Sequence, residues 1–196
     1  MSKFQVSAST VALLLLIGSA VAQPKPDDPS CMEGNQKKAL DCCRMPTLVE
    51  QSVMNRCITE NPMTPPVPGV QRKEGCCIAQ CVLVSLNVFK DNTIDRDAAK
   101  RVLTQSFGTN AGFNALIGGV VDECFNQVNN NAAYKVTPVA SAPGRPGCSF
   151  MPEGFVNCIK SRFFQQCPDA AWTKDAACDQ LKQKISTGCS FGSLMG

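Results

Sequence analysis

Thirteen cysteines are the feature that most limits how this 196-residue chain can fold. The first is Cys31 and the last is Cys189, so the apolar N-terminal stretch contains none. In an oxidising compartment this density predicts a disulfide framework, whereas in the cytosol it would suggest metal or redox chemistry. The odd number leaves at least one cysteine outside any pairing within a single chain.

The N-terminus indicates the oxidising compartment. Lys3 precedes the apolar run 11–17, and Ala20-Val21-Ala22 has the small-x-small pattern that signal peptidase cleaves. The run is shorter than the roughly 18 apolar residues of a membrane helix. We therefore predict a signal peptide over residues 1–22, a secreted extracellular domain over residues 23–196, and no insertion into a membrane.

The chain contains no histidine, and this removes several kinds of chemistry. Ser-His-Asp and Cys-His nucleophiles and mixed Cys/His zinc sites all need that residue. We therefore expect a protein that is not an enzyme and that has no cofactor and no metal site. The 19 basic and 16 acidic residues form no run of five like charges, so nucleic-acid binding is not expected either.

Apolar residues recur at helical spacing in six segments, which predicts an all-α fold. Asp95 is an expected helix start, Gly108 an expected left-handed stop, and Pro168 an expected end. Either Thr173 or Asp175 is expected to cap the last helix. Gly118-Gly119 inside one segment suggests either a close contact between helices or a break. Proline-rich loops are predicted over 62–69 and 135–147, and the helical segments are 48–57, 74–89, 95–107, 110–128, 152–167 and 173–185.

Helix geometry restricts which cysteines can share a partner. Cys77 and Cys81 lie one turn apart on nearly the same face, so each can reach a different neighbouring element. Cys158 and Cys167 are nine residues apart, a rotation of about 900°, and face opposite sides of their helix. The spacing therefore predicts a network of cross-links between elements, in which no disulfide closes a local ring.

The order of the cysteine intervals resembles that of the Plus-C odorant-binding proteins of dipteran insects. Starting at Cys57, the numbers of residues between successive cysteines are 19, 3, 42, 23, 9, 8 and 10. Pro168 directly follows Cys167. The resemblance covers 122 residues, Cys57 to Cys178. It implies a single odorant-binding-protein-like domain of about six to eight helices around an apolar cavity, with cysteine-containing extensions at both ends.

The resemblance also implies interlocked pairing of six core cysteines. The implied bonds are Cys57–Cys81, Cys77–Cys158 and Cys124–Cys167, and Cys42 or Cys43 is an alternative to Cys57. The pairing of the other seven cysteines stays open; they are Cys31, Cys42, Cys43, Cys76, Cys148, Cys178 and Cys189.

By the same resemblance, the function is reversible transport of small hydrophobic molecules such as odorants or pheromones. Pocket walls of this kind are built from core apolar side chains, each of which could equally be ordinary core. Tyr134 is a candidate for orienting a ligand, and the C-terminal tail either folds over the cavity or frays. The pocket candidates are Phe89, Phe107, Phe113, Leu116, Phe125, Phe155, Ile159, Phe163, Phe164, Trp172, Phe191 and Leu194.

The sequence is compatible with several alternatives. A secreted structural protein with a solid core and a macromolecular partner would need the same disulfides. The proline-rich loops or an extra thiol would allow a homodimer. If the resemblance holds, the protein resides in sensillum lymph and delivers ligand to an olfactory receptor. Without histidine, ligand affinity should change little between pH 7 and 5.5.

Overall fold

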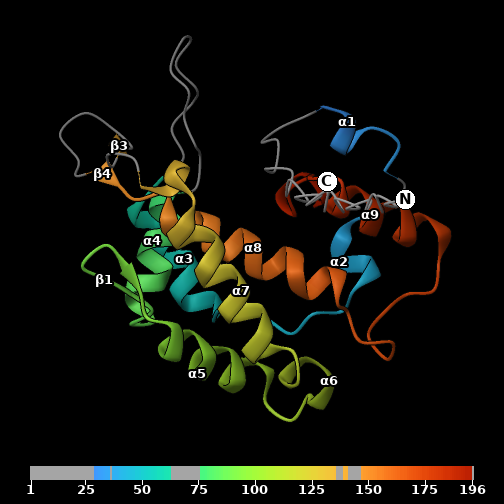
Figure 1. The fold of residues 1–196 in the computed structure, drawn as a ribbon, viewed down its shortest axis with the longest axis horizontal. Coiled ribbons are helices and arrows are strands. Elements are labelled where there is room, and N and C mark those ends of the chain that lie inside the picture. Colours follow the sequence, from blue (N-terminus) through green and yellow to red (C-terminus); the bar gives the residue numbers. More distant parts are fainter. Residues whose placement is uncertain (1–28, 36, 63–75, 136–138, 141–146, 196) are drawn as a thin grey trace, which may run out of the picture.

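The computed structural model describes residues 29–35, 37–62, 76–135, 139–140 and 147–195 (Figure 1). The predicted signal peptide, most of the first proline-rich loop and part of the second lie outside the described residues. Within them the fold is all-α, as predicted, with nine α-helices and two short 3-10 helices. No helix in the described ranges has both the length and the apolar character needed to cross a membrane.

Helix α8 (Met151–Gln165) is central to the arrangement, because it packs against three other helices, α4, α7 and α9. In Figure 1 it runs from the side of the molecule that holds α4 to the side that holds α2 and α9. The remaining helices are α1 (Pro29–Met32), α2 (Ala39–Cys42), α3 (Gln51–Glu60), α4 (Cys76–Ser85), α5 (Arg96–Phe107), α6 (Ala111–Asn114), α7 (Ile117–Asn130) and α9 (Ala176–Ser186), with 3-10 helices η1 (Ala132–Tyr134) and η2 (Gly192–Leu194).

Side-chain caps set several helix ends where the sequence indicates them. Asp95 accepts a hydrogen bond from the Ala98 N–H at 2.8 Å and begins α5. Asp175 accepts one from the Ala177 N–H at 2.8 Å and begins α9. Gly108 ends α5 with a φ of +53°, in the left-handed region that favours glycine. These predicted boundaries are confirmed.

Helix α4 ends earlier than its apolar pattern predicts. The pattern continues to Phe89, but the helix stops at Ser85 because Asn87 turns left-handed, with a φ of 55°. Two strands follow, β1 (Phe89–Lys90) and β2 (Thr93–Ile94), paired antiparallel across Asp91-Asn92. Both turn residues also have positive φ, which is the geometry of a tight two-residue hairpin.

The predicted helix over 110–128 is interrupted, but not at its glycines. It divides into α6 and α7 at Ala115 and Leu116. Gly118 and Gly119 both lie inside α7 and are exposed, and an added Cβ at either position would meet no atom within 4 Å. The glycines therefore mark neither a break nor a close contact between helices.

Three of the six disulfides interlock the central helices. They are Cys57–Cys81, Cys77–Cys148 and Cys124–Cys158. The first is the bond that the resemblance implies, whereas the implied Cys77–Cys158 and Cys124–Cys167 bonds are wrong. The interlocked order is nevertheless kept: among these six cysteines the first pairs with the third, the second with the fifth and the fourth with the sixth.

Packing explains why the fifth and sixth positions are taken by Cys148 and Cys158. Strand β4 (Gly147–Cys148), paired with β3 (Val139–Ala140), contacts α4 and brings Cys148 to Cys77. Helices α7 and α8 pack along each other, which brings Cys124 to Cys158 with their Cα atoms 5.6 Å apart. Cys158 and Cys167 therefore join different elements, as predicted, although α8 ends at Gln165 and Cys167 lies just beyond the helix.

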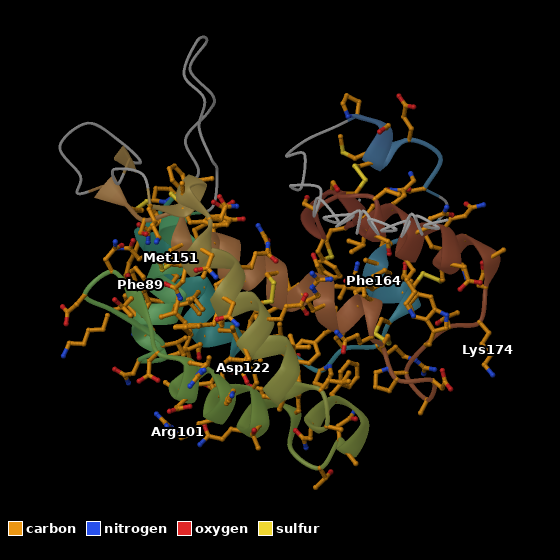
Figure 2. The ribbon with its side chains drawn as sticks, in the orientation of Figure 1. Phe89, Arg101, Asp122, Met151, Phe164 and Lys174 are labelled. Carbon is orange, nitrogen blue, oxygen red and sulfur yellow. A yellow bond between two sulfur atoms is a disulfide. The ribbon has the colours of Figure 1, made fainter. Side chains whose placement is uncertain are left out.

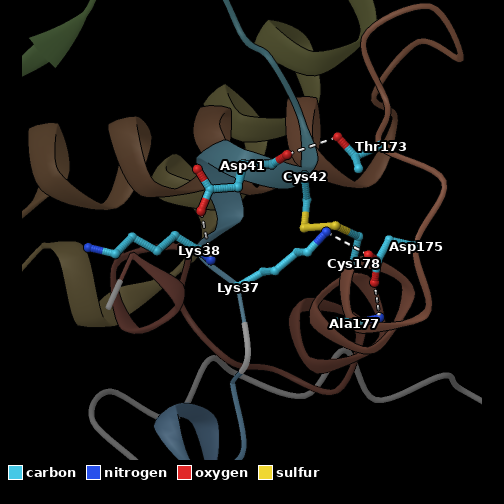
Figure 3. A network of polar contacts seen from close by, with 8 residues as sticks. All are labelled: Lys37, Lys38, Asp41, Cys42, Thr173, Asp175, Ala177 and Cys178. Atoms are coloured by element: carbon cyan, nitrogen blue, oxygen red, sulfur yellow. Dashed lines mark hydrogen bonds and ion pairs between the residues drawn. A yellow bond between two sulfur atoms is a disulfide. The ribbon is translucent and has the colours of Figure 1, made fainter.

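The other three disulfides join the two ends of the chain. They are Cys31–Cys189, Cys42–Cys178 and Cys43–Cys167, and we call the contact of residues 31–44 with residues 167–189 the N–C seam. Figure 3 shows part of it, where Lys37 pairs with Asp175 and the Thr173 hydroxyl donates to the Asp41 carbonyl at 2.9 Å. The seam makes both cysteine-containing extensions part of one covalent frame.

Candidate functional site

All twelve pocket candidates belong to one contiguous apolar cluster. This cluster also contains the cysteines of the N–C seam, except Cys31. Nine of them are buried; Leu116, Phe125 and Trp172 are partly exposed. Phe125 lies towards the surface, since the Arg96 guanidinium is 5.7 Å from its ring centroid. The sequence therefore selects residues that do share one core. Whether they enclose a ligand remains a prediction.

One group of rings forms a fully enclosed set. Phe107 of α5, Phe113 of α6 and Phe163 of α8 have centroids 5.0 to 6.0 Å apart, in tilted and edge-to-face contacts. All three are buried, and Phe113 and Phe163 have no exposed surface. We call them the inner ring set. Such edge-to-face contacts stabilise a core beyond the burial of area alone.

A second group of rings lies towards the N–C seam. The Phe164 ring contacts Trp172 at 5.4 Å and Phe191 at 5.8 Å between centroids. Phe164 and Phe191 are buried, whereas Trp172 is partly exposed, and the Lys182 ammonium lies 4.4 Å from the Trp172 ring centroid. We call Phe164, Trp172 and Phe191 the outer ring set. In Figure 2 its Phe164 lies far from Phe89 and Met151.

The two ring sets diverge because Phe163 and Phe164 are consecutive residues of one helix. Neighbouring side chains on a helix point about 100° apart, so α8 sends one phenylalanine to each set. The outer set also fixes the C-terminal tail, since Phe191 and Leu194 are 2% and 0% exposed. The alternative of a frayed terminus is therefore wrong for these residues.

Tyr134 packs on α8 with its ring directly against the backbone of Gly154. A Cβ placed at Gly154 would lie 2.6 Å from Tyr134 Cζ, so only glycine leaves room for the ring. Burial raises the pKa of the Tyr134 hydroxyl, and the charge of Glu153 raises it further, while a hydrogen bond with Gln127 acts in the opposite direction. Tyr134 is thus a half-buried neutral polar group beside α8.

Three sulfur atoms meet at the start of α4. The Sγ atoms of Cys76, Cys77 and Cys148 lie within 4.8 Å of one another. Two of them are already bonded to each other, and a disulfide sulfur lacks the thiolate charge that binds a metal. Cys76 is the one cysteine that belongs to none of the six disulfides, and its side chain is only 6% exposed. Its burial disfavours the covalent dimer that the sequence left open.

Lys160 of α8 is a residue that the sequence analysis missed. It is half-buried on the stripe of α8 that also carries Val156 and Phe164, four residues before and after it. Desolvation lowers the pKa of its ammonium group. The signal in the sequence was a lysine at a position where helical spacing expects an apolar residue.

An all-α core crossed by three interlocked disulfides is the architecture of the insect odorant-binding proteins, the class that the cysteine intervals indicated. The family model described as AgamOBP47-like matches residues 46–184, most of the chain, and the protein belongs to this family. The match confirms the resemblance at the level of odorant-binding proteins. Membership of the Plus-C subfamily stays a prediction.

Two relatives from Anopheles gambiae are similar over nearly the whole chain. General odorant-binding protein 67 is 27% identical over 190 residues, which cover 94% of this chain and 90% of the relative. Odorant-binding protein 47 is 28% identical over 193 residues, which cover 92% of this chain and 80% of the relative. The similarity therefore extends to the cysteine-containing ends that form the N–C seam.

Proposed function

We propose that this protein is a secreted carrier that reversibly binds small hydrophobic molecules and works by burying them, without catalysis. Membership of an odorant-binding family supports the proposal. The observation that carries it within the molecule is the outer ring set, which continues from the core to the partly exposed Trp172. In the tissue, the proposed role of this protein is to carry an odorant through sensillum lymph to an olfactory receptor.

The outer ring set is the better ligand site of the two. The three rings of the inner set, from α5, α6 and α8, are buried against one another, so a ligand would have to displace packed rings. One ring of the outer set, Phe191, belongs to the short C-terminal tail and not to a long helix, so a movement of the tail would open this set. We place the apolar part of the ligand against the outer set.

Displacement of the fluorescent probe N-phenyl-1-naphthylamine tests the function. A carrier binds the probe saturably at about one molecule per chain, and a small lipophile displaces it. The matched variants Phe163→Leu and Phe164→Leu change neighbouring, equally buried rings of the two sets. We expect Phe164→Leu to weaken probe binding several-fold and Phe163→Leu to weaken it less.

The second candidate function is a structural or interaction protein with a solid core. The complete burial of Phe113 and Phe163 in mutual ring contacts is the observation that favours it. For such a protein the probe binds without saturation, and neither variant alters its fluorescence.

A further inference from the structure

Cys76 lies beside a disulfide to which it does not belong. Its Sγ atom and those of Cys77 and Cys148 are within 4.8 Å of one another, and Cys77 and Cys148 form the bond that ties α4 to β4. Cys76 belongs to none of the six disulfides, so it carries the thiol of this cluster. A thiol next to a disulfide is the arrangement from which thiol–disulfide exchange starts.

The three sulfur atoms are buried together with Phe150 in a small apolar cluster, separate from the main core. Cys76, Cys77 and Cys148 are 6%, 7% and 8% exposed, and the half-buried Tyr134 packs against the cluster. Burial hinders attack by a thiol from another molecule, since exchange requires access to the sulfur, whereas Cys76 is already at the disulfide. Exchange at this cluster is therefore intramolecular.

Chain geometry decides which sulfur Cys76 attacks. Attack on Cys77 would join adjacent residues, whose Cα atoms are about 3.8 Å apart, less than the roughly 4.4 to 6.8 Å that is usual for a disulfide. Attack on Cys148 joins two different elements, and the Cα atoms of Cys77 and Cys148 are already 5.1 Å apart. The bond to Cys148 is therefore the favoured product.

We propose that Cys148 exchanges between Cys77 and Cys76, so that the folded protein interconverts between two disulfide isomers. The Cys76 thiol gives up its proton, and its sulfur forms a bond to the Cys148 sulfur. The Cys77–Cys148 bond breaks, its electron pair leaves on the Cys77 sulfur, and that sulfur takes up a proton. One thiol and one disulfide are present before and after, so the step needs no oxidant and no reductant.

The exchange changes how β4 is held against α4. Consecutive residues of a helix point about 100° apart, so the two isomers attach Cys148 to different sides of α4. The same contact includes a hydrogen bond from the Ser149 N–H to the Gln80 side chain at 2.7 Å, and α8 begins two residues after Ser149. The exchange therefore acts at the start of the central helix, and it does not depend on the proposed carrier function.

The position of the thiol separates this exchange from an inert Cys76 that only fills apolar space. The folded protein is held at about pH 8.5, the ordinary pKa of a thiol, and is then quenched in acid, unfolded and alkylated with N-ethylmaleimide. After reduction, fragmentation of the peptide that contains both residues assigns the label to Cys76 or to Cys77. We expect label on both, with roughly a tenth or more of it on Cys77.

The control for this measurement is Cys76→Ser, which removes the attacking sulfur and locks the Cys77–Cys148 bond. Any label on Cys77 in this variant is the background from partial reduction. Label on Cys77 above that background in the wild type supports the proposal. Label on Cys76 alone, or label on Cys77 no higher than the background, would overturn it.

Two preparations of different history test whether the isomers interconvert. Protein secreted by cells and protein refolded in vitro should reach the same share of label on Cys77 after incubation at the same pH, because exchange erases the history of folding. Shares that stay different, or a rate that rises with protein concentration, would overturn intramolecular exchange.

Removal of one sulfur at a time tests the geometry. In Cys77→Ser a Cys76–Cys148 bond should form in place of the original one and leave no thiol to label. In the matched variant Cys148→Ser, both Cys76 and Cys77 should be labelled. Thiols on Cys76 and Cys148 in Cys77→Ser would show that Cys76 does not reach Cys148, contrary to the proposal. If Cys77→Ser does not fold, the label positions in the wild-type protein decide.

Discussion

At the residue scale, two helical glycines of this protein have opposite roles. Gly154 leaves the space that the Tyr134 ring fills, whereas Gly119 faces open space on α7. Glycine inside a helix weakens it unless a close neighbour requires the missing side chain. The same substitution at the two positions should therefore change stability in opposite directions.

Gly154→Ala should lower the free energy of unfolding by about 1 to 3 kcal/mol, because the new methyl group overlaps the Tyr134 ring. Gly119→Ala, the matched control, should raise it by up to about 1 kcal/mol. Urea denaturation monitored by circular dichroism measures both changes. A Gly154→Ala protein as stable as the wild type would contradict the packing of Tyr134 on α8.

Tyr134 is the only tyrosine of the chain, so its ionisation can be followed by absorbance near 295 nm. Burial and the nearby Glu153 raise its pKa above the usual value of 10.0. We expect ionisation above pH 10 in the native protein and near pH 10 in denaturant. A folded-state pKa above the unfolded value adds stability that is complete below pH 10 and is lost as the pH rises through the folded pKa. Native ionisation at or below pH 10 would contradict the burial of the ring.

At the element scale, two kinds of contact hold the short helix α1 at the C-terminal end of α9. One is the Cys31–Cys189 disulfide, and the other is a set of hydrogen bonds from Lys184. The Lys184 ammonium lies 2.6 to 3.2 Å from four oxygens at the end of α1 and in the turn after it, and its three N–H groups are shared among them. Carbonyls at a helix C-terminus attract a cation, so Lys184 neutralises this end. The four acceptors are the backbone carbonyls of Ser30, Cys31 and Glu33 and the side-chain oxygen of Asn35.

Lys184→Met should lower the free energy of unfolding by about 1 to 3 kcal/mol, the range for hydrogen bonds to a charged group, with the lower end favoured because the site is partly exposed. It should also increase hydrogen exchange in residues 29–35 selectively. Gln180→Met, at an exposed position of the same helix, is the control and should change neither quantity. Unchanged exchange in Lys184→Met would show that the disulfide alone holds α1.

The sequence predicted elements well wherever one residue type decides a boundary. Asp95, Asp175 and Gly108 act as caps in the structure because their side-chain oxygens or their backbone freedom suit those positions. The end of α4 was missed because the apolar pattern continues into β1, and periodicity does not separate a buried strand from a buried helix. Left-handed Asn87 was the available signal.

At the scale of the whole molecule, the disulfide pairing shows what spacing can and cannot decide. The expectation that Cys158 and Cys167 have different partners is confirmed, although Cys167 lies beyond the end of α8. The spacing did not reveal that β4 approaches α4, so Cys148 was not placed among the interlocked six. The candidate ring residues were found because core phenylalanines are visible in any sequence. Lys160 was missed because its neighbours are set by tertiary packing.

The pH response of the whole molecule should be weak in the mildly acidic range, because the chain has no histidine. Hydrogen bonds from Lys37 and from the Ala177 N–H hold the pKa of Asp175 below the usual 3.8. A lowered folded-state pKa adds stability that is present above the unfolded value and is lost as the pH falls through the folded one. Probe affinity and unfolding temperature should therefore stay nearly constant from pH 7 to 5.5. A tenfold loss of affinity over that range would contradict this expectation.

The central claim is that the helical core takes up one lipophilic molecule reversibly. Native mass spectrometry of the protein without its predicted signal peptide, incubated with decanoate, measures this most directly, since it counts ligands on each intact folded chain. The account predicts one bound ligand per chain, saturating with concentration and removed by exchange with a competing lipophile. A spectrum that shows only the unliganded chain, or a number of adducts that rises without saturation, would contradict it.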